Sequence, residues 1–325
     1  MFVKYDDKSV RLIGRWSRQK DRAVTTACGA KIEFAFYGKN AVLHFDKEYC
    51  CRPCPHIWIQ LDEGGRIEAT VEKYMRICSK EEGLHHVVII FKSAVEMQHR
   101  WYEPLVAHLT FLGYEAENSG GLEQRVERYI EFIGDSITEG ILIDEEYRLN
   151  NNYEQNNRPF QDDVTATYAY LTAENLKLEP LIMGYGGVGL TKGGSGSVPK
   201  AVDAYPFCYN EHYTDMPHPV YVVINYGAND RSVGVEQYLN EYERLLDEVY
   251  EHHNETQVIV LSAFCGWCYK ELKGFVDNYN LKRERHAQYI NTYGWISPTP
   301  LHPNREGHIK IANKLTEEMK RRNLT

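Results

Sequence analysis

Residues 129–140 read Tyr-Ile-Glu-Phe-Ile-Gly-Asp-Ser-Ile-Thr-Glu-Gly, an apolar run followed by a glycine, an aspartate and a serine. The run predicts a short strand over 129–133, and Gly134 permits the tight bend that leads into a helix. Ser136 would then stand where the helix begins, with backbone N–H groups directed at any negative charge that forms beside its hydroxyl. A serine is a weak nucleophile at neutral pH, so this interpretation requires a base and oxyanion donors elsewhere in the chain.

Three further motifs follow Ser136 along the chain. The first is glycine-rich, Gly184-Tyr185-Gly186-Gly187-Val188-Gly189-Leu190-Thr191, and the second, Tyr226-Gly227-Ala228-Asn229-Asp230, follows an apolar run over 220–225. The third, Leu301-His302-Pro303-Asn304-Arg305-Glu306-Gly307-His308, leads into an expected helix. Gly-Asp-Ser, a glycine block, Gly-x-Asn-Asp and His-Pro-Asn in this order resemble the SGNH (GDSL-like) hydrolases, and the resemblance covers about residues 126–325.

The overall composition excludes several classes of protein. The chain has 325 residues, 43% of them hydrophobic and 26% charged, with a formal net charge of −9. This length allows two domains, and the negative charge argues against nucleic acid and anionic membrane surfaces as partners. No stretch approaches the ~20 apolar residues of a membrane span, and the N-terminus lacks a hydrophobic signal core. The chain as given is therefore expected to be cytoplasmic.

Eight cysteines are too few for a disulfide scaffold at this length. Cys50, Cys51 and Cys54 fall in an expected loop, and Cys265 and Cys268 follow an expected strand. A zinc site would need two such groups to converge, and no histidine spacing supports one. Reduced structural thiols are expected, and no metal or other cofactor is expected.

Residues 1–115 read as strands and turns with almost no helical periodicity. Seven alternating or β-rich runs are expected to be strands: 11–16, 31–37, 41–45, 56–61, 66–71, 85–91 and 108–112. Turns are expected at Tyr37-Gly38-Lys39-Asn40 and at Glu63-Gly64-Gly65. Seven short strands at close spacing indicate a β-sandwich, which is expected to end within 115–121.

From about residue 126 onward, strands and helices alternate. A helix is expected over 232–253, followed by a strand over 257–263 and, near the C-terminus, by a closing helix over 305–321. An earlier helix face is expected from Val164, Tyr168, Leu171 and Leu178, and the inward face of the closing helix from Ile309, Ala312, Leu315 and Met319. Alternation of this kind predicts a mostly parallel sheet with helices on both faces, whose ligands bind beyond the carboxyl ends of the strands.

An N-terminal β-sandwich before an SGNH domain is similar to carbohydrate esterase family 2, whose members remove acetyl groups from plant polysaccharides or oligosaccharides. The resemblance implies a flavodoxin-like, three-layer α/β/α hydrolase domain over 119–325, preceded by a jelly-roll-like β-sandwich over 1–118. It also implies that Ser136 attacks an ester carbonyl and that His302, which precedes Pro-Asn, is the base. His308 is the competing histidine and is expected to be structural.

By the same resemblance, the oxyanion donors are the Ser136 backbone N–H, the Gly189 N–H and the Asn229 side-chain amide. With six glycines within 184–194, a shift of the glycine donor to Gly187 stays open. Asp135 and Asp230 are expected to hold their loops by hydrogen bonds.

The chain departs from the family where an aspartate usually precedes the base by three residues, because Thr299 stands there. Loss of a triad acid is costly, so three explanations compete. A main-chain carbonyl or the Thr299 hydroxyl holds the imidazole in a Ser–His dyad; or a carboxylate such as Glu139 or Asp230 substitutes; or the domain is weakly active. The dyad is favoured, because prolines flank Thr299 on both sides and stiffen the backbone.

Aromatic rings commonly hold sugars, which makes Trp267 and Tyr226, each after an expected strand, the candidates for substrate binding, with Tyr185 as a weaker one. The polar insertion 143–163 could form a wall over the cleft or a solvated loop. The expected activity is removal of O-acetyl groups from xylo- or manno-oligosaccharides. The alternatives are a carbohydrate-binding protein with a vestigial hydrolase domain, and an SGNH lipase or thioesterase. The oligomeric state does not follow from the sequence.

Overall fold

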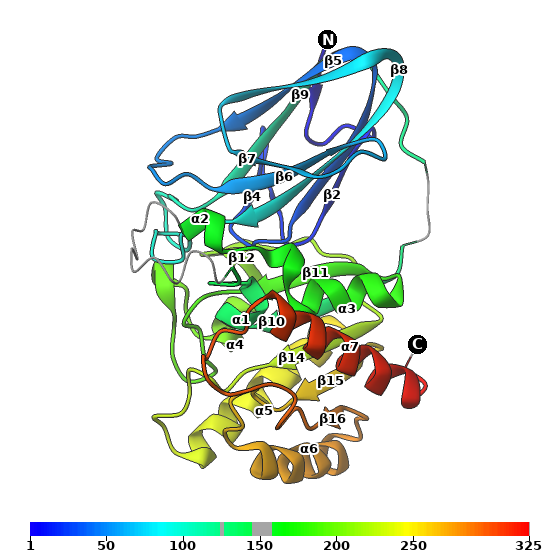
Figure 1. The fold of residues 1–325 in the computed structure, drawn as a ribbon. Coiled ribbons are helices and arrows are strands. Elements are labelled where there is room, and N and C mark those ends of the chain that lie inside the picture. The colour runs from blue at the N-terminus through cyan, green and yellow to red at the C-terminus, as the bar shows by residue number, and fades with distance from the viewer. Residues whose placement is uncertain (124–126, 145–157, 325) are drawn as a thin grey trace.

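The computed structural model describes residues 1–123, 127–144 and 158–324. Within them the chain forms an N-terminal antiparallel sheet and a C-terminal parallel sheet flanked by helices (Figure 1). Among these residues, no helix is long and apolar enough to cross a membrane.

The N-terminal sheet has nine strands in the described residues, in the order β3-β4-β9-β5-β8-β6-β7, with β1 paired to β9 and β2 to β5. Its strands are β1 (Phe2–Lys4), β2 (Val10–Ile13), β3 (Ser17–Arg18), β4 (Ala23–Thr25), β5 (Lys31–Asp46), β6 (His56–Leu61), β7 (Ile67–Thr70), β8 (Tyr74–Ser93) and β9 (Leu109–Ser119). The pairings are antiparallel, and the turn expected at Glu63-Gly64-Gly65 joins β6 to β7.

The turn expected at Tyr37-Gly38-Lys39-Asn40 is wrong. Residues 31–46 form one strand, β5, and its register with β8 shifts between Gly38 and Asn40. A glycine beside polar residues therefore marks an irregularity inside a continuing strand here, since φ at Gly38 is 116°. The last strand, β9, runs to Ser119, so the polar stretch 115–121 is largely sheet, and the division at 118/119 stays a prediction.

The parallel sheet has the order β11-β10-β14-β15-β16. Its strands are β10 (Tyr129–Gly134), β11 (Glu179–Gly184), β14 (Tyr221–Asn225), β15 (Gln257–Leu261) and β16 (Gln288–Ile290). In chain order this is 2-1-3-4-5, the flavodoxin-like arrangement, whose ligands bind beyond the first and third strands. Ser136 follows the first of these strands and Asn229 follows the third.

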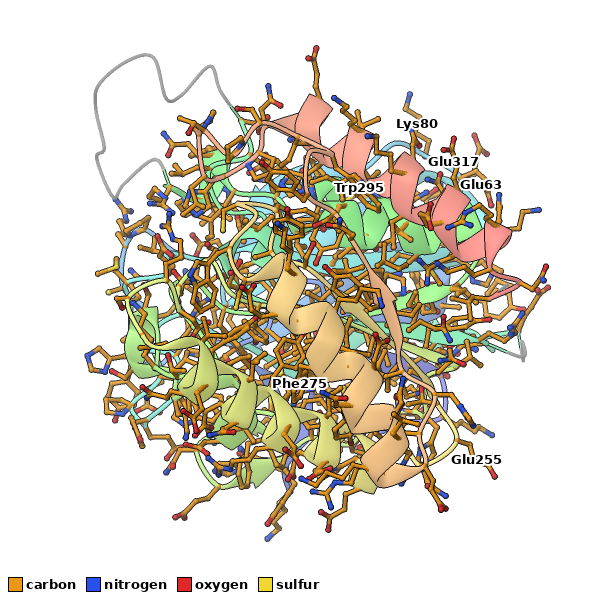
Figure 2. The ribbon with its side chains drawn as sticks, turned by 90° about the horizontal axis from the view of Figure 1, so that it is seen from below. Glu63, Lys80, Glu255, Phe275, Trp295 and Glu317 are labelled. Carbon is orange, nitrogen blue, oxygen red and sulfur yellow. The ribbon has the colours of Figure 1, made fainter. Side chains whose placement is uncertain are left out.

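Two hydrophobic clusters cover the two faces of this sheet. Because successive side chains of a strand point to opposite faces, Phe132 joins one cluster and Ile133 the other. Helices α3 (Tyr168–Leu176) and α7 (Arg305–Arg321) pack on the first face, and α5 (Val235–His252) and α6 (Tyr269–Arg283) on the second. Figure 2 shows α5 and α6 beside each other, with Phe275 at their contact, where its ring lies 5.9 Å from that of Tyr242.

The shorter elements are α1 (Ser136–Glu139), α2 (Arg158–Gln161), η3 (Val164–Ala166), η4 (Ser195–Ser197), α4 (Ala201–Ala204), β12 (Phe207–Tyr209) and β13 (His212–Tyr213). The closing helix α7 has the expected bounds, and Ala312, Leu315 and Met319 are buried on its inner face. The expectation for Ile309 is wrong, because 49% of it is exposed, and Ile311 takes its place in the core.

The two sheets share one of these hydrophobic clusters. It joins side chains of the N-terminal sheet, such as Phe34, to Ile130 of the parallel sheet and Val164 of η3. At Gly29, whose φ is 92°, a side chain would meet Ile182 at 2.9 Å. The backbone of the N-terminal half at Gly29 therefore packs directly against a side chain of the parallel sheet. Between them the Arg15 guanidinium and the Glu131 carboxylate, both fully buried, form an ion pair of 2.9 Å.

Candidate active site

Ser136 occupies the first position of α1, directly after the carboxyl end of β10. Asp135 is the N-cap of this helix and accepts a hydrogen bond from the Ile137 N–H at 3.0 Å. This cap fixes the start of the helix, and the Ser136 N–H belongs to the first turn, whose donors have no partner within the helix. The Ser136 side chain is nearly buried, at 7% exposure.

His302 meets Ser136 although 166 residues separate them along the chain. The His302 Nε2 lies 2.8 Å from the Ser136 Oγ, which is hydrogen-bond distance. His302 stands just before α7, whose N-cap Asn304 accepts a hydrogen bond from the Gly307 N–H at 2.9 Å. The His-Pro-Asn motif therefore combines the histidine with the cap that anchors its helix.

Asn229 lies at the same edge of the sheet. Its Nδ2 donates to the Val188 carbonyl at 3.0 Å and lies 3.5 Å from Asp135 Oδ2. Asp135 is fully buried, and this burial raises its pKa to about 7. The Asn229 amide thus links the turn after β14 to the nucleophile turn and to the glycine-rich loop.

The glycine-rich loop is held by Asp230, which accepts hydrogen bonds from the Leu190 N–H at 3.2 Å and from the Thr191 N–H at 2.9 Å. The loop-holding roles expected for Asp135 and Asp230 are therefore confirmed. The Gly189 N–H donates to the Lys192 carbonyl at 3.0 Å. The Gly187 N–H makes no hydrogen bond with any described residue.

A buried ion pair that no local motif indicated joins the last residue of α1 to the N-terminal half. The Arg100 guanidinium, from the segment between β8 and β9, makes a bidentate contact with Glu139, whose Oε2 also accepts from the Gly186 N–H at 2.7 Å. Both side chains are essentially inaccessible to solvent. Glu139 therefore joins the nucleophile helix, the glycine-rich loop and the N-terminal half.

The carboxylates considered as substitutes for the missing aspartate are engaged elsewhere. Both oxygens of Glu139 bind Arg100, and those of Asp230 bind the 190–191 loop. The Thr299 carbonyl accepts a hydrogen bond from the Ser297 Oγ at 2.7 Å. The dyad therefore stays a prediction.

His308 is structural, as expected. It is 1% exposed, and its Nδ1 accepts a hydrogen bond from the Tyr168 N–H at 3.0 Å. Tyr168 begins α3, so the imidazole satisfies one of the backbone donors at the start of that helix.

The expectation that Tyr226 binds substrate is wrong. Its side chain is 0% exposed and belongs to the core between the parallel sheet and α5, so a sugar ring has no access to it. Tyr185 is equally buried, with its hydroxyl 3.0 Å from Thr26 Oγ1. Trp267 is partly exposed and packs edge-on against Tyr238, with ring centroids 4.7 Å apart. Its role in substrate binding stays a prediction.

A second network, also missed in the sequence, surrounds Arg305. Its Nη2 lies 2.9 Å from Asp144 Oδ2 and 3.1 Å from Asp163 Oδ2. Asp163 in turn accepts from the Trp58 indole N–H of β6 at 3.1 Å. The position of Arg305 directly after His-Pro-Asn was the one signal in the sequence that could have indicated this network. Its partners Asp144 and Asp163 could not be identified, because they are distant in sequence. Most of the insertion 143–163, residues 145–157, lies outside the described residues.

The eight cysteines are free thiols. Burial raises the pKa of Cys268 to about 11 and that of Cys50 to about 12, which keeps both protonated at neutral pH. In the described residues, no group of three or more His, Cys, Asp or Glu side chains could hold a metal ion.

Comparison with known proteins supports the fold. No protein-family model matches the chain. The cellulase/esterase CelE of Acetivibrio thermocellus is 25% identical over 324 residues, which cover 90% of this chain but 37% of that protein. The chain thus spans little more than a third of this relative.

Two solved structures extend over nearly the whole chain. A family two carbohydrate esterase from Clostridium thermocellum, in complex with cellohexaose, is 21% identical with a TM-score of 0.77, covering 96% of this chain and 98% of that one. An acetyl xylan esterase from the rumen bacterium Butyrivibrio proteoclasticus is 16% identical with a TM-score of 0.77, covering 99% and 98%. The resemblance found in the motifs is therefore confirmed at the level of the fold: the chain has the fold of the family two carbohydrate esterases, on an SGNH-type parallel sheet.

Proposed function

We propose that this protein is a serine esterase that removes O-acetyl groups from carbohydrates. The observation that carries the proposal is the 2.8 Å contact between His302 Nε2 and Ser136 Oγ, at the sheet edge where ligands of this fold bind. A histidine within hydrogen-bond distance of a serine hydroxyl at a helix start is the arrangement that activates a serine nucleophile. The similarity to carbohydrate esterases supports a carbohydrate ester as the substrate.

In the proposed reaction, Ser136 Oγ attacks the acetyl carbonyl carbon while His302 Nε2 takes the hydroxyl proton. The tetrahedral intermediate then collapses, and His302 returns that proton to the departing sugar oxygen, which leaves an acetyl-serine ester. A water molecule, deprotonated by His302, attacks this ester, and acetic acid leaves as the proton returns to Ser136 Oγ. The acid then ionises to acetate by losing its remaining proton to water. General acid–base assistance of this kind contributes typically ~10²–10⁴ in rate.

The developing oxyanion needs donors, each worth ~10²–10³ in turnover. The Ser136 N–H and the Asn229 amide are two of the proposed donors. The third is one of two glycines: Gly189, whose N–H would have to release the Lys192 carbonyl, or Gly187, whose N–H has no described partner.

We also infer that His302 works as a dyad with Ser136, its imidazole oriented without a triad aspartate, and that the N-terminal sheet is a jelly-roll-like β-sandwich. The first inference is supported by the hydrogen bonds that Glu139 makes with Arg100 and that Asp230 makes with the 190–191 loop. The second is supported by the length of β5, whose two halves pair with different strands, β2 at residues 31–34 and β9 at residues 36–46.

The test is acetate release from acetylated xylo- and manno-oligosaccharides by wild type, Ser136→Ala, His302→Gln and His308→Gln. Ser136→Ala and His302→Gln should fall at least ~100-fold, since each removes a participant in the chemistry. The matched control, His308→Gln, should keep its turnover at temperatures where it is folded. Oligosaccharide binding by wild type without acetate release would favour the vestigial binding protein instead. Release from acyl-thioesters or long-chain esters alone would favour the lipase or thioesterase alternative.

A further inference from the structure

A groove separate from the Ser136–His302 contact lies between the N-terminal sheet and the helices α3 and α7. It has a volume of about 370 Å³, within the range of small-molecule sites. Trp58 of β6 and Arg66, just before β7, form one wall, and Leu171 and Glu174 of α3 form another. Arg305 and the 49%-exposed Ile309 of α7 close it. Both halves of the chain therefore contribute to this groove.

Trp58 is the aromatic side chain of the groove, and it is held in place. Its indole N–H donates to Asp163 Oδ1 at 3.1 Å, and the Lys92 ammonium lies 5.7 Å from the ring centroid. Asp163 is fixed in turn by Arg305 at 3.1 Å and by the Thr165 hydroxyl at 2.7 Å. An aromatic ring held this way loses little conformational entropy when a ligand packs against it.

The charges of the groove are balanced. Among the lining residues, Arg66 pairs with Glu174 at 3.4 Å and Arg305 with Asp163 at 3.1 Å, so two cations face two anions. Arg305 also contacts Asp144, which lies outside the lining. A wall with no net charge offers no preference for an ionic ligand, while its guanidinium and carboxylate groups can exchange hydrogen bonds with hydroxyl groups. An aromatic ring, apolar Leu171 and Ile309, and paired polar groups suit a neutral polyhydroxylated ligand such as a sugar.

Residues of the groove are linked through the backbone to the segments that carry Ser136 and His302. The Asp163 N–H donates at 3.0 Å to the carbonyl of Gly140, the residue that ends the helix begun by Ser136. Four residues of helix span only ~6 Å. On the other side, Arg305 lies three residues after His302. The backbone therefore joins residues of the groove to the helix begun by Ser136 and to the segment that carries His302.

We propose that this groove is a distal subsite for the sugar chain of the substrate, with Trp58 as its binding platform. The inference rests on the proposed esterase function and adds that the enzyme selects oligosaccharides over acetylated monosaccharides. It assigns the N-terminal sheet a direct part in substrate selection. An acetylated sugar at Ser136 would extend its chain past Arg305 onto Trp58.

The test compares 4-nitrophenyl acetate, which has no sugar, with acetylated xylo-oligosaccharides of one to six units. Wild type should show kcat/KM that rises with chain length. The loss of kcat/KM in Trp58→Ala should be at least ten-fold greater on the longest substrate than on 4-nitrophenyl acetate. Ala166→Trp should give the same pattern by filling the groove from its other wall. Tyr74→Ala, which removes a 58%-exposed aromatic from the same sheet, is the matched control and should leave the length profile unchanged.

The two proposals fail in different ways. Ser136-dependent hydrolysis with the same length profile in wild type, Trp58→Ala and Ala166→Trp would overturn the subsite and leave the esterase proposal standing. Absence of hydrolysis from every ester would overturn the esterase proposal. In that case the binding of xylohexaose and mannohexaose, measured by calorimetry, decides the subsite. At least ten-fold weaker binding by Ala166→Trp supports it, and equal or undetectable binding by both proteins overturns it.

Discussion

Replacement of Arg100 by methionine tests whether the buried ion pair with Glu139 is required for folding. In wild type the Glu139 carboxylate accepts two hydrogen bonds from Arg100, one from the Gly186 N–H at 2.7 Å and one from the Cys28 thiol at 3.8 Å. Methionine fills much of the same space but provides no donor. Arg100→Met therefore leaves a buried carboxylate without a cationic partner, held only by the Gly186 N–H and the Cys28 thiol.

Breaking a buried pair in this way costs about 3–5 kcal/mol, a large part of the ~5–15 kcal/mol that stabilises a typical domain. The double variant Arg100→Met/Glu139→Gln should recover most of the loss, since it removes both charges and its side-chain oxygen can still accept from Gly186.

The assay is urea unfolding of wild type, both single variants and the double variant, followed by tryptophan fluorescence and circular dichroism. The double-mutant cycle isolates the coupling between the two side chains. Two results would refute the reasoning. One is a fall of less than ~1 kcal/mol in the free energy of unfolding of Arg100→Met. The other is a double variant whose free energy of unfolding falls by the sum of the falls in the two single variants.

Three further outcomes follow from burial. Tyr226→Phe should be neutral or stabilising by up to ~1 kcal/mol in urea unfolding, because the Tyr226 hydroxyl is buried with no described partner; a change in KM for oligosaccharides would contradict its place in the core. Burial raises the pKa of Asp162 to about 7. The protonated carboxyl therefore makes its full contribution to the free energy of unfolding only below about pH 4, and this contribution is lost as the pH rises through 7. Asp162→Asn should therefore gain stability relative to wild type between pH 5 and 8, and identical pH profiles would contradict this. Ile311→Ala should cost about 2–5 kcal/mol and Ile309→Ala less than ~0.5, measured as differences in unfolding free energy; equal losses would contradict the orientation of α7.

The sequence predicted the features that depend on short-range pattern. Gly-Asp-Ser after an apolar run placed Ser136 at a helix start, and the 3.6-residue period located the helix over 305–321. Because parallel strands end at a common edge, the meeting of Ser136 with the turn that carries Asn229 followed from topology.

The features that depend on three-dimensional packing could not be predicted in this way. The residue after a strand can turn to either side of the sheet edge, and Tyr226 turns into the core. Gly38 and Asn40 have the composition of a turn, but β8 and β9 pair across them and keep the strand extended. The Arg100–Glu139 pair joins positions 39 residues apart through the interface of the two halves, and neither residue has a local signature.

The hydrophobic cluster common to the two sheets limits how this architecture can change in evolution. Phe34 and Ile130 belong to one cluster, and the backbone at Gly29 packs against Ile182. Each half therefore has an apolar surface, covered by the other half, where the two meet. A half expressed alone would present this apolar surface to water and would be prone to aggregate. Gene fusion or exchange would therefore have to transfer both halves as one inheritable unit, and recombination at the linker between β9 and β10 would be selected against even where that linker tolerates insertions.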